Sequence, residues 1–274
     1  MLDPLLLYSA YLKPQYRQLL AMNNAIAQCE GLKELKSIAA EPLISRRGRS
    51  ADEKKLPVAA SSFYDKDYFL NGKESGKSLY ENYRWLPTET TAMAKAICSH
   101  LGSHQDERIL DYGCARGYLV KALRALGLKA YGCDVSTFAV SNCDPEVSDY
   151  ITLVDETLKL SALPREFQDY YDFIICKDVL EHIPQSEVGT LIRSLRKLSN
   201  SLYVVVPLGD DGAYRIEDYS LDQSHVIAED ENWWAELFDD CGFSNIDFSF
   251  SVKGVKEAAS LIHPYGNGHF RLSY

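Results

Sequence analysis

The sequence predicts an α/β fold in which a parallel sheet carries helices on both faces. Between residues 108 and 207, apolar runs of strand length alternate with amphipathic stretches of helix length, the pattern of parallel strands joined by helices. Two of these runs, residues 172–176 and 202–206, are almost continuously apolar, as expected for strands covered on both sides. A glycine-containing turn follows the first strand, where an open parallel sheet binds its ligand.

The predicted elements follow one another in a regular order. Apolar runs predict strands in RILDYG, KAYGCDV, YITLV, YDFIICKD and SLYVVVP, and helical spacing of apolar residues predicts helices in ETTAMAKAICSHL, YLVKALRALG, TFAVSN and VGTLIRSLRKL. Beyond them, WWAELFDDCGF is typical of a helix that ends before Gly242. We expect NIDFSFSV and GHFRLSY to pair as antiparallel strands.

The organisation of the chain predicts two parts. Residues 1–60 are expected to form a helical extension and a polar linker, because helical periodicity over residues 5–38 gives way to a charged stretch with two prolines. This extension offers a substrate lid or an apolar face for a homodimer. Residues 61–274 form the second predicted domain, which opens with a segment dense in aromatic residues.

Composition narrows the class of protein. The chain has 274 residues and a net charge of −10, which disfavours nucleic-acid binding because phosphate is repelled. The seven cysteines form no C-x-x-C pair, which indicates reduced thiols and a cytoplasmic setting. Residues 1–7 are short and interrupted by Asp3 and Pro4, so neither a signal peptide nor a membrane association is predicted.

The turn in ILDYGCARGYL, residues 109–119, predicts the chemistry of the ligand. A dinucleotide-binding turn requires G-x-G-x-x-G/A, but the sixth position from Gly113 is Tyr118. The observed pattern, D-x-G-x-A-x-G, places Asp111 before the turn, where a carboxylate repels phosphate but accepts a hydrogen bond from an ammonium group. Gly113 and Gly117 permit close approach of the backbone. The pattern therefore favours a ligand without a pyrophosphate.

A second acid stands at the end of the next predicted strand. Asp134 lies 23 residues after Asp111, in YGCDVS. A carboxylate at this position can bind both hydroxyls of a ribose. The alternative is an ordinary turn with an unrelated acid, which the presence of acids at two adjacent strand ends disfavours.

These stretches, together with YYDFIICKDVLEHIP, resemble the class I S-adenosylmethionine-dependent methyltransferases, in particular a group common in glycan and natural-product biosynthesis. The resemblance covers about residues 62–250 and is weak for the substrate half. It implies a Rossmann-like sheet of about seven strands, six parallel and one antiparallel. It also implies S-adenosylmethionine as the cofactor.

The resemblance assigns roles residue by residue. The methionine part of the cofactor is expected to lie against Asp111, Gly113, Cys114, Ala115 and Gly117, with Tyr118 directly after them; Ala115 stands where the family has glycine. Asp134 is expected at the ribose, Val135 against the adenine, and Asp155 or Glu156 at the adenine amino group. Lys177 and Asp178 are expected to line the methyl-transfer cleft. An aromatic cover over the cofactor, or else a core-packing segment, is predicted from Tyr64, Tyr68, Phe69, Tyr80, Tyr83 and Arg84.

Candidate catalytic residues fall in KDVLEHIP. If this stretch is helical, Asp178, Glu181 and His182 share one face. His182 is the best candidate for a base because imidazole titrates near neutral pH. His225 in DQSHV is the second candidate.

The same residues predict a metal site. Asp178, Glu181, His182 and His225 resemble the divalent-metal set of small-RNA terminal 2′-O-methyltransferases and of ubiquinone-pathway O-methyltransferases. Such a set suits magnesium or manganese, which lowers the pKa of a substrate hydroxyl. In metal-free relatives, the glutamate and histidine order the start of a helix instead, and this alternative stays open.

The predicted function is O-methylation of a small hydroxylated acceptor, such as a sugar or a natural product. The same cofactor half would serve an N-, C- or carboxyl-methyltransferase, and a non-catalytic scaffold could retain the fold. The intact acids and glycines disfavour a scaffold, and Tyr118 disfavours an NAD-dependent oxidoreductase.

Overall fold

The computed structural model describes residues 60–155 and 163–274. The predicted extension, residues 1–60, lies outside them except for its last residue, and so does Glu156.

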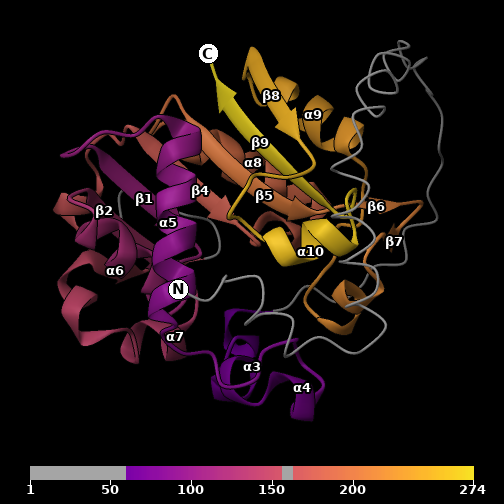
Figure 1. The fold of residues 1–274 in the computed structure, drawn as a ribbon, viewed down its shortest axis with the longest axis horizontal. Helices are drawn as coiled ribbons and strands as arrows, with labels where there is room; N and C mark the ends of the chain where they lie inside the picture. Colours follow the sequence, from indigo (N-terminus) through magenta and orange to yellow (C-terminus); the bar gives the residue numbers. More distant parts are fainter. Residues whose placement is uncertain (1–59, 156–162) are drawn as a thin grey trace, which may run out of the picture. The chain divides into compact units, whose positions relative to one another are not determined.

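The centre of the described fold is a seven-stranded sheet with the order β3-β2-β1-β4-β5-β9-β8 (Figure 1). The strands are β1 (Arg108–Tyr112), β2 (Lys129–Asp134), β3 (Ile151–Leu153), β4 (Phe173–Lys177), β5 (Leu202–Pro207), β8 (Asn245–Ser249) and β9 (Asn267–Ser273). Strands β1 to β5 pair in parallel, whereas β9 is antiparallel to both of its neighbours, β5 and β8. The predicted sheet of six parallel strands and one antiparallel strand is therefore confirmed.

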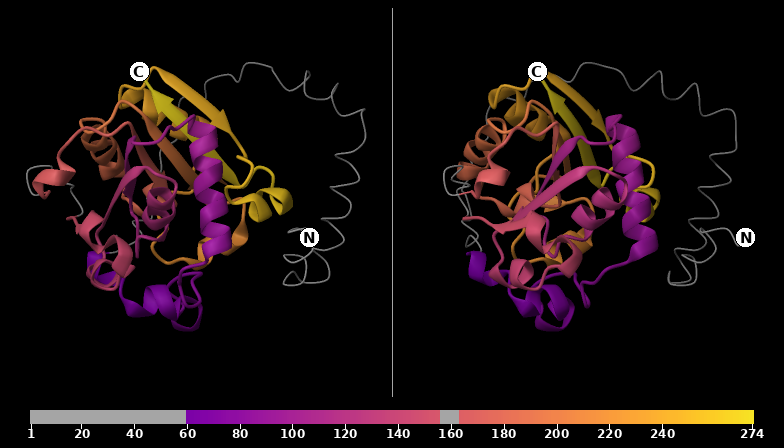
Figure 2. Two further views of the ribbon diagram at one scale, coloured as in Figure 1. Left: turned by 60° about the vertical axis from the view of Figure 1, so that its left-hand side comes forward. Right: turned by 90° about the vertical axis from the view of Figure 1, so that its left-hand side faces the viewer.

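Helices cover both faces of this sheet. The described helices are α3 (Lys66–Leu70), α4 (Gly72–Ser75), α5 (Pro87–Leu101), α6 (Tyr118–Ala125), α7 (Thr137–Ser141), α8 (Gln185–Leu195), α9 (Glu231–Asp240) and α10 (Glu257–Ile262), of which α5 and α6 pack on one face and α8 and α9 on the other. Figure 2 shows α5 on one side of the sheet, with the orange α8 and α9 on the other. Among the described helices, none is both long and apolar enough to cross a membrane.

Alternation along the strands divides the interior into two cores. Ile175 of β4 packs with α5 and α6, while its neighbours Ile174 and Cys176 pack with α8 and α9. The same alternation holds in β5, where Val204 and Val205 belong to opposite cores. Successive strand residues point to opposite faces, so the side chains of one apolar run pack against both helix layers.

Three local features differ from the sequence predictions or were missed by them. KDVLEHIP is not one helix: Asp178 has φ of 55°, and only Leu180–His182 forms a 3₁₀ turn. The expectation that Asp178, Glu181 and His182 share a helical face is therefore wrong. A two-stranded ribbon, β6 (Gly209–Asp210) with β7 (Ala213–Tyr214), and the helix α10 were not predicted.

The turn after β1 depends on glycine for two separate reasons. Gly113 has φ of 80°, and a Cβ atom placed on it would lie 2.4 Å from Cγ2 of Val179. Val179 belongs to the segment that follows β4, so a side chain at Gly113 would push apart two adjacent strand ends.

We predict that Gly113→Ala lowers the free energy of unfolding by about 2–4 kcal/mol, because left-handed strain and overpacking add. Gly102→Ala is the matched control, since Gly102 has φ of 70° but no atom within 4 Å of its would-be Cβ. It should cost only about 1 kcal/mol. Urea unfolding of both variants measures the difference, and equal losses would contradict the role of Val179.

Candidate active site

Hydrogen bonds hold the turn after β1 against the end of β2. The amide groups of Gly113 and Cys114 donate to the Cys133 carbonyl at 2.8 and 3.1 Å, and that of Ala115 donates to the Asp134 carboxylate at 2.7 Å. The second Asp134 oxygen accepts from the Ser136 amide at 2.8 Å. The first amides of the turn are thus occupied by protein acceptors, unlike those of a loop that binds phosphate. This arrangement agrees with a ligand that has no pyrophosphate.

The two predicted cofactor acids are both buried at adjacent strand ends. Burial raises the pKa of Asp111 to about 7; the Lys177 charge opposes this rise and the Asp134 charge adds to it. Burial also raises the pKa of Asp134, although the Ser136 and Ala115 amides oppose that rise. A bound cation would favour the ionised form of Asp111.

The remaining predicted cofactor residues surround these acids or lie just beyond them. Cys114 and Ala115 are buried within the turn, and Gly117 caps the start of α6, which begins at Tyr118. Val135 is half-buried after β2, and Asp155 is exposed two residues past β3.

The aromatic segment packs against Ala115 of the glycine turn, a position that fits both roles predicted for it, a cofactor cover and a core-packing segment. Tyr68 and Phe69 form a cluster with Ala115 and Ala139, and the partly buried Tyr64, Tyr80 and Tyr83 pack against it. The Tyr68 hydroxyl also donates to Asp222 at 2.9 Å, which ties this segment to the connection after β5. Arg84 is exposed.

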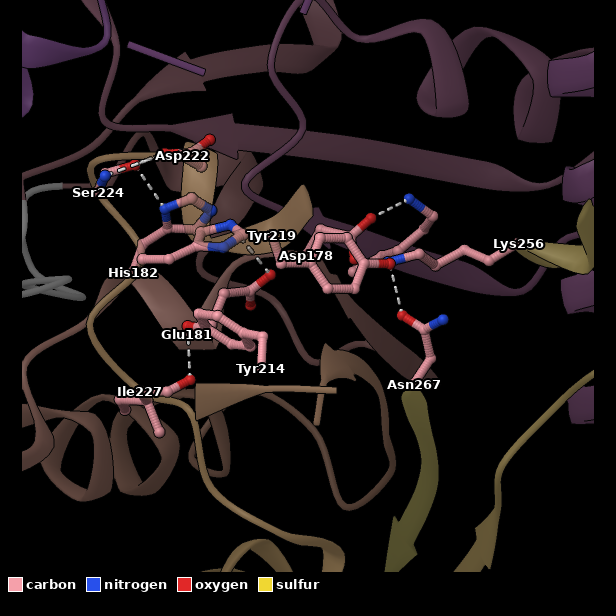
Figure 3. A network of polar contacts seen from close by, with 12 residues as sticks. Asp178, Glu181, His182, Tyr214, Tyr219, Asp222, Ser224, Ile227, Lys256 and Asn267 are labelled. Carbon is pink, nitrogen blue, oxygen red and sulfur yellow. Dashed lines mark hydrogen bonds and ion pairs between the residues drawn. The ribbon is translucent and has the colours of Figure 1, made fainter. Parts of the chain in front are cut away.

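Glu181 and His182 lie close together (Figure 3), and His225 joins them. Their ligand-type atoms lie within 4.8 Å of one another. The Glu181 side chain is completely buried, and neither of its carboxyl oxygens has a hydrogen-bond partner among the described residues. Nε2 of His225 lies 3.9 Å from Oε1 of Glu181. A buried carboxyl without partners is costly, so it indicates a position prepared for a ligand.

Burial disfavours the charged form of all three groups. It raises the pKa of Glu181 well above its ordinary value, and the negative charge of Asp178 adds to the effect. Burial lowers the pKa of His182 to about 4, with a smaller contribution from His225, and it also lowers the pKa of His225. Neutral imidazoles are the form that binds a metal or accepts a proton.

Two residues that were not predicted determine which nitrogen of His182 is protonated. The Ser224 hydroxyl donates to Asp222 at 2.6 Å and has only one proton to give. The contact of 2.8 Å between Nδ1 of His182 and Oγ of Ser224 therefore places the proton on Nδ1. Nε2 is left with its lone pair. The D-x-S-H spacing of Asp222, Ser224 and His225 was the sequence signal for this network.

Asp178, in contrast, does not join the cluster of ligand-type atoms. Its carboxylate binds the ammonium groups of Lys177 at 2.5 Å and Lys256 at 2.6 Å. Burial favours the neutral acid, but the two lysine charges outweigh burial and hold the pKa of Asp178 well below its usual range. Of the four predicted metal ligands, the structure thus brings together Glu181, His182 and His225.

The family of the chain follows from a comparison with known protein families. A family model described as a methyltransferase domain matches residues 85–255. The chain belongs to this family. Its sheet order and its D-x-G-x-A-x-G turn are those of a class I S-adenosylmethionine-dependent methyltransferase, and S-adenosylmethionine is its cofactor.

Curated relatives match this methyltransferase only in part. A ubiquinone biosynthesis O-methyltransferase of Burkholderia ambifaria is 33% identical over 93 residues, which cover 32% of this chain and 40% of the relative. The corresponding enzyme of Nitrosomonas europaea is 28% identical over 102 residues, covering 37% and 43%. The matched region therefore spans about two-fifths of these relatives.

Solved structures support the fold alone. A S-adenosylmethionine-dependent methyltransferase of Archaeoglobus fulgidus aligns with a TM-score of 0.51 at 15% identity, covering 68% of this chain and 94% of that one. A phosphoethanolamine N-methyltransferase of Haemonchus contortus aligns with a TM-score of 0.55 at 14% identity, covering 79% and 60%.

We predict that cofactor affinity increases as the pH rises toward neutrality, because Asp111, the residue expected to bind the cofactor ammonium, attracts it only when ionised. Below its pKa of about 7, Asp111 becomes protonated and loses its charge. Titration calorimetry with S-adenosylhomocysteine from about pH 5.5 to about pH 7.5, where the ligand amine stays mostly protonated, measures this slope.

Asp111→Asn should remove the slope and weaken binding by about tenfold at the upper pH. Asp149→Asn, a change at an exposed acid, should retain it. A slope that persists in Asp111→Asn would assign the titration to another group.

We also predict that Ser224→Ala changes the tautomer of His182, because Nδ1–H then loses its acceptor. Imidazole ¹⁵N chemical shifts report which ring nitrogen carries the proton. Tyr68→Phe is the matched control, since it removes the hydrogen bond to the other oxygen of Asp222. Unchanged His182 shifts in Ser224→Ala would contradict the assigned network.

Proposed function

We propose that this methyltransferase transfers the methyl group of S-adenosylmethionine to a hydroxyl oxygen of a small acceptor, such as a sugar or a natural product. The observation that carries the proposal is the buried Glu181 carboxyl, without a hydrogen-bond partner in the described chain, beside His182 and His225. The names of the curated relatives, which are O-methyltransferases, support the same atom class.

The chemistry of the acceptor explains why this cluster favours oxygen. Methyl transfer from a sulfonium is an in-line displacement, for which the enzyme mainly aligns the acceptor with the methyl group. A neutral amine is already nucleophilic, whereas a hydroxyl gains greatly from loss of its proton. Nε2 of His182 is held as an acceptor by Ser224 and Asp222, and we assign it to receive that proton when no ion is bound. An ion held by the cluster would occupy the same lone pair and would itself lower the pKa of the hydroxyl.

The donor set also fits a divalent cation. One carboxylate and two imidazoles would hold it, and both carboxyl oxygens of Glu181 are free to do so within the described structure. With Asp178 engaged by lysines, the mixed nitrogen and oxygen set suits manganese or a similar transition ion better than magnesium, which prefers oxygen ligands. When bound, such an ion would lower the pKa of the acceptor hydroxyl.

Nitrogen, carbon and carboxyl acceptors remain the alternative within the same fold. The Haemonchus contortus neighbour acts on phosphoethanolamine nitrogen according to its name, but at 14% identity it supports the fold alone. A scaffold without catalysis is disfavoured because the turn, Asp111 and Asp134 are all in place.

An assay of methyl transfer from radiolabelled S-adenosylmethionine tests the proposal. The acceptors are used in pairs, each pair being a hydroxyl compound and its amine analogue. We expect transfer to the hydroxyl, and a decrease of about 100-fold or more in kcat for Glu181→Gln without a loss of S-adenosylhomocysteine affinity. Chelation should reproduce the decrease, and manganese should reverse it. Glu187→Gln, at an exposed acid in the first turn of α8, is the control.

Two outcomes would count against this function. Faster transfer to the amines would favour an N-methyltransferase. Full activity of Glu181→Gln, with no effect of chelation, would show that the cluster takes no part in the reaction. It would favour the alternative that Glu181 and His182 order the turn Leu180–His182.

A further inference from the structure

Two ammonium groups from distant parts of the chain meet at one carboxylate beside the proposed active site. Lys177 ends β4, and Lys256 precedes α10 in the C-terminal part of the chain. Both contact Asp178, Lys177 at 2.5 Å and Lys256 at 2.6 Å. Figure 3 labels Lys256 together with Asp178. Their side chains are mostly buried, at 21% and 13% exposure.

Within ion-pair distance, the charges of this group do not balance. Among the described residues, Asp178 is the one carboxylate that pairs with the two ammonium groups, and the Asp111 carboxyl acts on Lys177 only from farther away. The excess is local, because the whole chain carries a net charge of −10. An unbalanced charge in a poorly hydrated position favours the binding of a counter-ion.

A neutral donor lies in the same group and is also unsatisfied. Oδ1 of Asn267 accepts a hydrogen bond from the Tyr219 hydroxyl at 2.7 Å, which orients the amide. Its Nδ2 is fully buried and has no acceptor among the described residues. The Lys256 ammonium lies 4.6 Å from the centre of the same Tyr219 ring. Tyr219 therefore positions both a cation and an amide donor.

The backbone at this group is held in an unfavourable conformation. Asp178 and Lys256 have φ values of 55° and 50°, in the left-handed region that residues other than glycine seldom adopt. Both strained residues belong to the same ion pair. Strain of this kind concentrates at ligand-binding sites, where the surrounding structure imposes it.

The position relative to the cofactor indicates which molecule would bind. Lys177 and Asn267 stand at the carboxyl ends of the parallel strands, since Lys177 pairs with Val205 and Asn267 with Pro207 of β5. Ligands of open α/β sheets lie at this edge. Lys177 is also close enough to Asp111 to lower the pKa of that group. Lys177 thus lies near Asp111, a predicted cofactor residue, and at the same edge of the sheet as Asn267.

We infer that Lys177, Lys256 and Asn267 form a subsite for an oxyanion, a carboxylate or a phosphate, carried by the methyl acceptor. This inference rests on the proposed function, because it assumes that an acceptor binds beside Glu181 and His182. Two cations and an amide N–H match the acceptor-only oxygens of such a group, and charge-assisted hydrogen bonds would orient it. The acceptor would then be a hydroxylated acid or a phosphorylated alcohol.

A binding measurement on the full chain, saturated with S-adenosylhomocysteine, tests the subsite without turnover. The probes are 4-fluorobenzoate and its uncharged partner 4-fluorobenzamide, followed by ¹⁹F NMR. We expect the carboxylate to bind about tenfold more tightly than the amide, and Lys177→Met or Lys256→Met to remove that preference. Lys256→Arg, which keeps the charge, should retain part of it. Lys253→Met, an exposed lysine in the same loop, should retain all of it.

Equal binding of the two probes to the unaltered protein would overturn the subsite, whatever the variants do. A weaker affinity of Lys256→Met for S-adenosylhomocysteine itself, with benzoate binding unchanged, would assign the lysines to the cofactor carboxylate and would also overturn it. Competition by inorganic phosphate would identify a phosphorylated acceptor, and its absence a carboxylate.

The outcome is separable from that of the proposed function. Benzoate binding that depends on the lysines, together with methyl transfer to amines only, would retain the subsite and reject O-methylation. Equal methylation of acids and their uncharged amides would retain O-methylation and reject the subsite.

Discussion

The buried carboxylate of Asp134 is the contact on which the arrangement of the cofactor site depends. It accepts one amide hydrogen bond from the turn after β1 and another from the start of α7, so a single side chain joins two adjacent crossover connections. The amides satisfy a charge that would otherwise be costly to bury. Because the turn is held against β2, its first amides donate to protein acceptors and do not form a phosphate-binding loop.

Burial then gives different properties to similar side chains farther along the same edge. Asp178 and Glu181 are three residues apart, yet two lysines lower the pKa of Asp178, whereas burial and the charge of Asp178 raise the pKa of Glu181. Asp178 has a left-handed backbone, and its carboxylate pairs with the two lysines, outside the cluster of Glu181, His182 and His225. A helix through this segment would have placed both acids together, and their repulsion would have prevented either role.

The connection after β5 completes the site from one side and the aromatic segment from the other. Asp222 contacts both, because it accepts from Tyr68 through one oxygen and from Ser224 through the other. The state of His182 is therefore linked to the placement of the aromatic cover. One carboxylate thus joins the aromatic segment to the hydrogen-bond network of His182.

The sequence by itself determined the class of fold and the cofactor half. Alternation of strands and helices is a local pattern, and the D-x-G-x-A-x-G turn with Asp134 places its groups within one βαβ unit, where connections have a single handedness. The terminal strand pair and the end of the tryptophan-containing helix at Gly242 followed from the same local signals.

Only the tertiary structure decided the partners of the acids after β4. KDVLEHIP contains a left-handed residue, Asp178, which interrupts a helix. The periodicity of the sequence does not predict this conformation. Lys256 and Asn267 come from the C-terminal part of the chain, and neither lies near Lys177 in sequence. Contacts between distant segments depend on how the sheet is ordered, and here the insertion of β9 beside β5 brings those donors to the active-site edge.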